Sequence, residues 1–394
     1  MEIVKRTEEL EQEAIELRRW FHRHPELSWQ EYETTEYIIA YLENLGIEVH
    51  RYEGRTGCWG MIYGGKAAAE CKTILLRADI DALPFEEETG LPYASLNKGA
   101  FHACGHDTHA AMLMIACKML MEIRNELQGN VKVLFQAAEE TAIGAKYYLE
   151  QGILNGVDAV YGCHTAGWQD AGTIAVNPGP RSAGTDEFSI HVQGVGCHGV
   201  MSHQWKDALV AACSIVMNLQ TMVSRMTNPI DTLVVTIGMI HSGSCYNIVA
   251  DSAQLTGTVR TYSNEVRLKA PEQMRQVAES TAAAFGCTAT VDYQFKTGPV
   301  VHDSAQMNRL AHDAVVKLFG EDTLRETRPI GGGDDFAYFS ERVPGMYAFI
   351  GAAKASEDGI VHAHHHPKVC FDENSMKMGI AMYVQMAVDY LSDK

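Results

Sequence analysis

The stretch KTILLRADID, residues 72–81, is an apolar run that ends in two carboxylates, Asp79 and Asp81. Short apolar runs bounded by polar residues predict buried strands. Three further runs of this kind lead into chemically reactive side chains: NVKVLFQAAEE (130–140), VDAVYGCH (157–164) and PGMYAFIGAA (344–353), which is followed by HAHHHP (362–367). Buried strands that repeatedly end in reactive residues are the pattern from which we predict the fold.

Helical patterns separate these strands. Apolar residues recur at helical spacing over residues 8–22, 30–45 and 108–124. Strands that alternate with helices predict an α/β fold with a mostly parallel sheet that is covered on both faces. Ligand sites in such folds form beyond the carboxyl ends of the strands. The reactive residues fall at those ends, so we expect them to share one site.

The middle of the chain has a different pattern. Predicted strands at 186–196, 232–243, 252–262 and 287–295 and helices at 206–226 and 265–285 follow the order β-α-β-β-α-β. This is the order of the ferredoxin-like split unit, and we expect Pro271 to delay the start of the second helix. The sequence therefore predicts a ferredoxin-like α+β domain inserted at 183–296. The catalytic α/β domain would comprise residues 1–182 and 297–394.

The composition is that of an ordinary globular protein, with 394 residues of which 46% are hydrophobic. The net charge of −18 would repel phosphate backbones, so we expect no nucleic-acid partner. Residues 1–21 have no apolar signal-peptide core, and the densest apolar run, 110–121, is too short to cross a bilayer, so we expect no membrane partner. The ten cysteines form no C-x-x-C pair and predict a reducing, cytoplasmic location.

A second stretch, FHACGHDTHA (101–110), holds the densest set of potential ligands. Its candidate metal ligands and acid–base groups are His102, Cys104, His106, Asp107 and His109. Cys104 and His106 are separated by one residue and stand just before the predicted helix at 108–124. A metal ion and the helix N-terminus would both stabilise a thiolate at that position.

A hydrolytic metal site needs ligands from separate segments and a base for the water proton. Further candidates are Glu140, His164 and one of the histidines at 362–366. Of the adjacent pair Glu139 and Glu140, one can bind metal while the other acts as base. Each residue also has an ordinary alternative: a buried thiol, a core histidine, a solvated strand end or a polar loop. Because all of them fall at predicted strand ends, the metal site is the better interpretation.

The same residues carry a family resemblance in blocks that occur in order. The blocks are FHRHPELSWQEYETTEYIIAYLENLGIEV (21–49), LRADIDALP (76–84), HACGHDTHAAML (102–113), FQAAEE (135–140), GCH (162–164), GCHG (196–199), NIVADSAQLTGTVR (247–260), GGGDDFAYF (331–339) and HHPKVCFDE (365–373). Together they resemble the amidohydrolase branch of the two-domain metallopeptidases. That branch includes aminoacylases, hippurate hydrolases and indole-acetyl-amino-acid hydrolases, and it is related to carboxypeptidase G. The resemblance covers nearly the whole chain.

The resemblance implies a dinuclear metal centre. Cys104 would bridge two divalent ions, and the other ligands would be His106, Glu140, His164 and His365. His365 fits the family's H-x-P step, eight residues before Glu373. Glu139 would be the general base and acid, and Asp81 would support the ligands from behind. A thiolate favours zinc, cobalt or nickel, while the carboxylate and imidazoles leave manganese open.

Three residues of the predicted inserted domain also match the family. His198 resembles a histidine that in relatives often reaches the active site of a neighbouring subunit, where it would polarise the scissile carbonyl or stabilise the oxyanion. Asn247 and Arg260 resemble residues that hold the substrate, and the arginine fork suits a carboxylate. An ordinary structural salt bridge is an equally good interpretation of Arg260. The sequence departs from the family beside His198, because Cys197 and Ser202 replace the usual glycine and proline.

The resemblance implies metal-dependent hydrolysis of the amide bond of N-acyl amino acids or related small amides, by a metal-activated water with Glu139 as general base. Two alternatives remain open: a dipeptidase or carboxypeptidase of the same family, and a catalytically silent metal-binding protein. A homodimer through the inserted domain is also implied. The helix at 206–226 is rich in Met, Val, Leu and Ala and could serve as that interface, or it could pack only on its own sheet.

Overall fold

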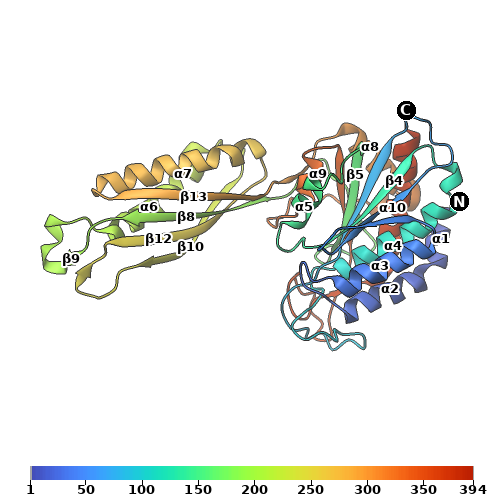
Figure 1. The fold of residues 1–394 in the computed structure, drawn as a ribbon, viewed down its shortest axis with the longest axis horizontal. Coiled ribbons are helices and arrows are strands. Elements are labelled where there is room, and N and C mark those ends of the chain that lie inside the picture. The colour runs from blue at the N-terminus through green and yellow to red at the C-terminus, as the bar shows by residue number, and fades with distance from the viewer. Residues whose placement is uncertain (1, 394) are drawn as a thin grey trace. The chain divides into compact units, whose positions relative to one another are not determined.

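The computed structural model describes residues 2–393, and these form two compact units. The first unit runs from the N-terminus to Gly179 and also contains His302–Arg328 and the chain from Tyr338 onward. The second unit contains Pro180–Val301 and Pro329–Ala337. Each unit is built on a sheet packed with helices (Figure 1).

A mostly parallel sheet forms the centre of the first unit. Its strands, in spatial order, are β1 (Glu48–Arg51), β2 (Cys58–Ile62), β4 (Asn130–Gln136), β3 (Thr73–Asp79), β5 (Ala159–Ala166), β15 (Gly345–Gly351) and β6 (Ile174–Ala175). The central strands β4, β3, β5 and β15 are parallel, and β1, β2 and β6 add antiparallel pairs at the edges. Every residue of β3, β5 and β15 is buried, which explains their continuous apolar character. The predicted sheet is confirmed.

The helices of the first unit lie against this sheet and against one another. They are α1 (Ile3–Glu9), α2 (Glu11–Arg23), α3 (Tyr32–Asn44), α4 (His106–Glu122), α5 (Gly144–Glu150), α8 (Ala305–Phe319) and α10 (Met376–Ser392), with the short α9 (Ala337–Ser340) where the chain re-enters the unit. α4 and α10 pack on each other and on β3 and β5. The helical stretch predicted at 8–22 contains a break at Leu10, where α1 gives way to α2.

The reactive segments follow the carboxyl ends of the parallel strands. β3 ends at Asp79, β4 ends three residues before Glu139, and His164 lies in the last part of β5. The long loop after β3 leads into α4 at His106. Gly105 permits this abrupt entry because its φ is 92°, a left-handed conformation that glycine adopts without steric cost.

The second unit has the ferredoxin-like arrangement. Its main elements are β8 (Gly184–Gln193), α6 (Ala208–Thr221), β10 (Leu233–Ser242), β12 (Ser252–Thr261), α7 (Asn264–Ala284) and β13 (Thr288–Thr297). The strands form an antiparallel sheet in the order β10-β12-β8-β13. α6 and α7 cover one face (Figure 1), where Phe188, Ile190, Ile215, Leu255 and Met274 form part of the core. The predicted β-α-β-β-α-β order is confirmed.

The prediction that Pro271 delays the start of α7 is wrong. The helix begins at Asn264 and continues through Pro271. Arg267 in the second turn forms a buried ion pair with Asp186 at 2.7 Å, and Met274 is fully buried in the core. Such tertiary contacts outweigh the missing backbone donor and the poor helix propensity of proline.

By length and composition alone, the helical stretch Ala208–Met226 could cross a membrane, with a mean hydropathy of 1.3. It consists of α6 and a following π-helical turn, Met222–Met226. Its inward side, including Ile215 and Leu219, packs into the core of the second unit. Its outward side leaves Met217 69% exposed, so the core explains the apolar character of only one face.

Candidate metal centre

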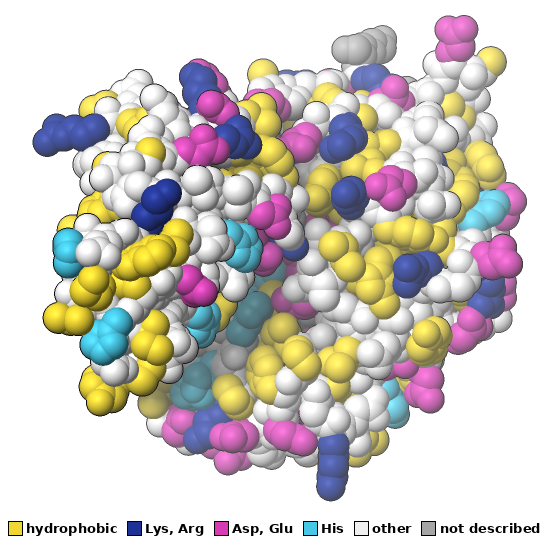
Figure 2. Space-filling model, turned by 60° about the vertical axis from the view of Figure 1, so that its left-hand side comes forward, with side chains coloured by type: hydrophobic (Ala, Val, Ile, Leu, Met, Phe, Trp, Pro, Cys, Tyr) yellow, Lys and Arg dark blue, Asp and Glu magenta, His cyan; other side chains and the backbone are white. Residues whose placement is uncertain are grey.

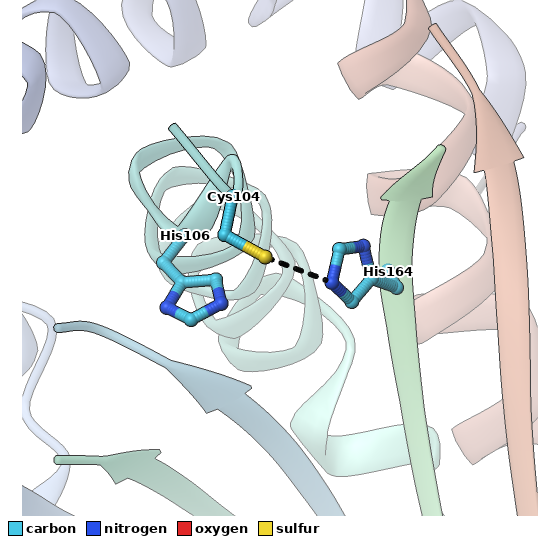
Figure 3. A group of neighbouring side chains, drawn as sticks. All are labelled: Cys104, His106 and His164. Carbon is cyan, nitrogen blue, oxygen red and sulfur yellow. Dashed lines mark hydrogen bonds between the residues drawn. The ribbon is translucent and has the colours of Figure 1, made fainter. Parts of the chain in front are cut away.

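Cys104, His106 and His164 bring potential ligand atoms together in the first unit (Figure 3). Their sulfur and ring nitrogen atoms lie within 4.8 Å of one another, and His164 Nε2 is 3.5 Å from Cys104 Sγ. All three side chains are buried. Cys104 and His106 stand at the entry to α4 and His164 stands in β5, so regular structure holds both sides of the group.

The ring of His106 is oriented by the segment that follows β3. Its Nδ1 donates to the carbonyl oxygen of Asp81 at 2.9 Å, and its Nε2 is buried without a hydrogen-bond partner among the described residues. Metal-binding histidines usually have one nitrogen held in this way. Burial lowers the pKa of His106, but the negative charge of Asp79, the neighbouring Cys104 and the hydrogen bond to Asp81 together outweigh burial, so the pKa lies well above its ordinary value. The same negative charges would stabilise a metal cation bound at Nε2.

His164 is prepared to act as a neutral ligand. Its Nδ1 donates to the carbonyl oxygen of Thr165 at 2.8 Å, which directs Nε2 towards Cys104. Burial, together with the neighbouring rings of His109 and His364, holds the pKa of His164 well below its ordinary value. The ring is therefore neutral at pH 7, the form that coordinates metals.

A second group of potential ligands shares Cys104 with the first. Cys104, Glu140 and His365 also hold ligand atoms within 4.8 Å of one another. Burial raises the pKa of the Cys104 thiol well above its ordinary value, and it raises the pKa of Glu140 to about 7. Glu140 Oε1 is buried and has no hydrogen-bond partner within residues 2–393. Burying such groups is costly unless they are paired or coordinate a cation.

The histidine-rich loop brings two histidines to this group. His365 Nε2 lies 3.7 Å from Glu140 Oε2, and the His365 side chain is 51% exposed. His364 Nδ1 lies 3.8 Å from Cys104 Sγ, while its Nε2 accepts a backbone amide hydrogen at 2.9 Å. Burial lowers the pKa of His364 to about 3. The sequence pattern selected His365 alone. Only the loop conformation, with φ of 63° at His365, shows that His364 also faces Cys104 while His365 faces Cys104 and Glu140.

Glu139 lies beside the first group of ligands. A carboxylate oxygen of Glu139 is within 4.8 Å of ligand atoms of His106 and Glu140. The Asp81 carboxylate accepts the backbone amide hydrogen of Glu139 at 3.1 Å and that of Glu140 at 3.0 Å. It also accepts the hydroxyl hydrogen of Ser28 at 2.6 Å. Asp81 thus contacts both the turn that carries the two glutamates and the ring of His106.

His109 lies near the same ligands but is fully occupied. Its Nδ1 donates to Asp79 at 2.5 Å, and its Nε2 accepts the backbone amide hydrogen of Thr165 at 2.8 Å. Asp79 also accepts from Arg77. Although Asp79, His106 and His109 are close enough to surround an ion, these hydrogen bonds leave His109 no free nitrogen, so its role is structural.

The two remaining candidates of the stretch 101–110 belong to neither group of ligands described above. Asp107 accepts from Arg18 Nε at 2.8 Å and pairs with His22 Nδ1 at 2.8 Å, which ties the start of α4 to α2. His102 is buried, and burial lowers its pKa to about 4. It belongs to no group of potential ligands among the described residues.

The predicted residues of the inserted domain lie in the second unit and fall into two places. His198 lies in β9 (Cys197–His198), which pairs with β11 (Ile248–Val249), and Gly199 donates its amide hydrogen to the carbonyl oxygen of Asn247 at 2.8 Å. His198 and Asn247 are therefore close neighbours, beyond the end of β8 (Figure 1).

Arg260 lies at the opposite end of that sheet. It is paired with Thr185 at the start of β8, and its Nη1 donates to Thr185 Oγ1 at 2.7 Å and to the Gly331 carbonyl oxygen at 3.3 Å. β8 has ten residues and strands rise about 3.4 Å per residue, so roughly 30 Å separates Arg260 from His198. The structure does not bring these two residues of one chain together.

The donor atoms of the first unit fit a metal centre. A thiol, imidazole nitrogens and a carboxylate oxygen converge from four segments of the chain, and two of these atoms are buried without another partner in the described part of the chain. This donor set suits borderline-soft divalent ions. With a second carboxylate beside it, at the carboxyl edge of a parallel sheet, the arrangement is that of a metal-dependent hydrolase.

Comparison with known proteins gives the same class. The model of peptidase family M20/M25/M40 matches residues 75–389. An N-acetyl-L-cysteine deacetylase of Bacillus subtilis is 40% identical over 93% of this chain and 85% of its own length. A thermostable carboxypeptidase of Saccharolobus solfataricus is 36% identical over 97% of this chain and 96% of its own length.

A solved structure matches over the whole fold. A Bacillus subtilis protein described as a dinuclear metal binding peptidase from the M20 family superimposes with a TM-score of 0.87 at 35% identity, over 98% of this chain and 100% of that one. The chain belongs to peptidase family M20/M25/M40 and is a hydrolytic enzyme.

Proposed function

We propose that the protein hydrolyses the amide bond of N-acyl amino acids or closely related small amides. The convergence of Cys104, His106, Glu140, His164 and His365, with Glu139 as a further carboxylate beside them, is the observation that carries this proposal. The similarity to an N-acetyl-L-cysteine deacetylase supports an acylated amine as the substrate.

Two divalent ions are proposed, held by the two groups that share Cys104. One ion would take Cys104, His106 and His164, and the other would take Cys104, Glu140 and His365. Zinc, cobalt and nickel suit the thiolate, and manganese suits the carboxylate and imidazoles. Ions in such a site polarise a carbonyl group and make water a stronger nucleophile at neutral pH.

Glu139 is the proposed general base and acid. It accepts a proton from the attacking water as the new C–O bond forms, and it passes a proton to the amide nitrogen as the C–N bond breaks. The products are a carboxylate and a free amine. His198 is proposed to donate a hydrogen bond to the carbonyl oxygen as negative charge develops there. Arg260 and Asn247 are proposed to hold the substrate, with the arginine fork on its carboxylate.

Aromatic side chains beside the ligands support an apolar acyl group on the substrate. The ring of Trp168 lies 4.7 Å from that of His364 and 5.7 Å from that of Phe349, measured between centroids. Trp168 remains 45% exposed. A large aromatic surface left open beside a polar site offers favourable burial to an apolar ligand group.

The test is amine release from N-acetyl, N-benzoyl and longer N-acyl amino acids, measured beside unmodified dipeptides. We expect release from the acylated compounds, with rates that rise with the apolar size of the acyl group. Release from dipeptides alone would contradict the proposal. That outcome would favour the runner-up, a dipeptidase or carboxypeptidase, which the similarity to a thermostable carboxypeptidase supports.

We also propose a homodimer formed through the second unit. Residues 208–224, in α6 and the following turn, contain no charged side chain, yet Met217 is 69% exposed. The edge strand β10 lies beside α6 and exposes Val234 and Met239. An uncharged helix next to an unpaired strand edge is the kind of surface that a second copy covers.

The dimer would also reconcile the positions of His198 and Arg260. Roughly 30 Å of sheet lies between them, so one small substrate cannot touch both side chains of a single chain. Apolar and histidine side chains gather at the forward end of the second unit in Figure 2. We propose that this end, with His198 and Asn247, serves the active site of the partner.

Charged substitutions test the dimer. Met217→Asp and Val234→Asp are expected to convert a dimer to a monomer by light scattering, because each buries a charge at the proposed contact. Leu268→Asp, on an exposed position of α7 (67% exposed), is the matched control and is expected to remain dimeric. A wild-type monomer at assay concentration would contradict the proposal.

A cytoplasmic location is the remaining proposal. All ten cysteines are free thiols in the structure, and the thiol of Cys104 must stay reduced to bind metal. Both features suit a reducing compartment. Recovery of the protein in a membrane or secreted fraction of its native cells would contradict this location.

A further inference from the structure

A buried carboxylate outside the ligand set fixes the turn that carries the two active glutamates. Glu31 is fully buried, and its Oε1 accepts the backbone amide hydrogen of Ala138 at 3.0 Å. Its Oε2 accepts the hydroxyl hydrogen of Thr56. Glu31 and Ala138 are 107 positions apart, so this contact is made only by the folded chain.

Side chains accept hydrogen bonds from four successive backbone amides of this turn. Tyr148 Oη accepts that of Ala137 at 3.1 Å, and Glu31 accepts that of Ala138. The Asp81 carboxylate accepts the next two, from Glu139 and Glu140. The backbone of the turn is thus held by three side chains from separate segments, and none of the three is a proposed metal ligand.

The conformation of Ala138 shows why the turn needs such support. Its φ is 59°, in the left-handed region that residues with a Cβ atom rarely adopt. A residue in this conformation costs of order 1–3 kcal/mol and persists only when its surroundings over-determine it. Glu31 supplies the contact to Ala138 itself, immediately before Glu139.

Glu31 is not needed for the local structure in which it stands. It occupies the N-cap position of α3, but its side chain makes no capping hydrogen bond there. That work is done by Glu26, whose carboxylate accepts the amide hydrogens of Glu33 at 3.2 Å and Thr34 at 2.8 Å. The side chain of Glu31 is committed to the turn at Ala138 instead.

We infer that Glu31 is a positioning residue, which holds Ala138 in its left-handed conformation so that Glu139 faces the reacting water and Glu140 faces the metal. The inference rests on the proposed function, because Glu31 would act through the general base Glu139 and the metal ligand Glu140. Losing the contact would let the turn relax and move both carboxylates.

The surroundings of Glu31 make glutamine a suitable isostere. Burial, with the neighbouring charge of Asp81, raises the pKa of Glu31 to about 8, so the side chain is mostly neutral at pH 7. A glutamine oxygen can accept the Ala138 amide hydrogen, and its amino group can donate to Thr56 Oγ1, which rotates to accept. An alanine can do neither.

The experiment compares Glu31→Ala, Glu31→Gln and the control Glu26→Ala with wild type. For each protein one measures zinc affinity by competition with a chelator, kcat and KM on the best substrate, and Tm after chelation. Glu31→Ala is expected to weaken zinc binding about 10-fold and to lower kcat by about 10–100-fold with little change in KM. Glu31→Gln is expected to restore both, and Glu26→Ala is expected to lower only Tm.

Three outcomes would overturn the inference: normal zinc affinity and kcat in Glu31→Ala, parallel losses in Glu31→Ala and Glu26→Ala, or a Glu31→Gln protein as defective as Glu31→Ala. If Glu31→Ala does not fold, Thr56→Val, which removes only the hydroxyl on Glu31, is expected to show the same losses to a smaller extent. A Thr56→Val protein with normal zinc affinity and kcat would then overturn it. Wild type without turnover would refute the proposed function, and the zinc affinities would still test Glu31.

Discussion

His164 places its Nε2 atom 3.5 Å from the Sγ atom of Cys104, although the two residues are 60 positions apart in the chain. The contact joins the end of a buried strand to the start of a buried helix. It is the most direct sign that the reactive strand ends form one site.

Removal of the metal is expected to abolish amide hydrolysis, and zinc or manganese is expected to restore it. Cys104→Ser removes the ligand that the two groups share, so zinc affinity is expected to fall at least about 100-fold, more than loss of a supporting residue costs. Metal content after dialysis and competition titration give the measurement. Cys71→Ser, at a thiol that belongs to no ligand group of the described residues, is the control; equal zinc affinity in the two variants would count against the site.

Asp81→Ala is expected to weaken zinc binding about 10–100-fold, because Asp81 holds the amides of Glu139 and Glu140 and contacts His106. The matched control is Asp158→Ala. Asp158 also accepts a backbone amide hydrogen in this unit, that of Thr73 at 2.7 Å. This contact lies at the start of β3, whereas the ligands follow the carboxyl ends of the strands. The control is expected to lower Tm without changing zinc affinity. An equal loss of zinc affinity in both variants would show that Asp81 has only a structural role.

The stability of the metal-free protein is expected to fall as pH rises above about 6.5, through His22. Burial lowers the pKa of His22, but hydrogen bonds to Asp107 and Glu87 outweigh burial and raise it above its ordinary value. A raised folded pKa stabilises the protein fully below the unfolded value, about 6.5, and this contribution is lost as pH rises through the folded value.

Thermal unfolding of the chelated protein between pH 6 and pH 9 measures this effect. The difference in Tm between wild type and His22→Gln is expected to shrink as pH rises. A His22→Gln difference that is constant over the same range would show that the buried pair contributes no pH dependence.

Mixed dimers test whether His198 serves the partner's site. His198→Ala and Glu139→Gln are each expected to be inactive as homodimers. After subunit exchange, half of the dimers carry one of each chain, and one of their two sites has both residues intact. Activity is then expected to return to about a quarter of the wild-type value. If the mixture stays inactive although exchange is complete, His198 acts within its own chain.

Much of this architecture was predictable from the sequence because strand burial and helix periodicity are local signals. The apolar runs at 72–81 and 130–140 became β3 and β4, and the reactive residues followed their carboxyl ends. The β-α-β-β-α-β order of the second unit was equally readable. Pro271 was misjudged, because the buried pair of Arg267 with Asp186 joins residues that local patterns cannot relate.

The ligand sphere was predictable only in part, since loop conformation sets the direction of each side chain. His364 approaches Cys104 and His365 approaches Glu140, and the H-x-P spacing pointed to His365 alone. His109 looked like a ligand in sequence, and only its bonds to Asp79 and Thr165 show that its nitrogens are occupied. The contact of Glu31 with Ala138 had no sequence signal, because left-handed backbone at an alanine comes from tertiary support.

Glu139→Gln gives the most direct test of the central claim, that a metal-dependent hydrolase uses Glu139 as its base. The variant keeps the size of the side chain and the backbone bond to Asp81 but cannot accept the water proton. One preparation is assayed for bound metal and for amine release from the best N-acyl amino acid. Full metal content is expected, with kcat lowered about 10²–10⁴-fold. A variant that binds metal and retains most of its turnover would contradict this claim.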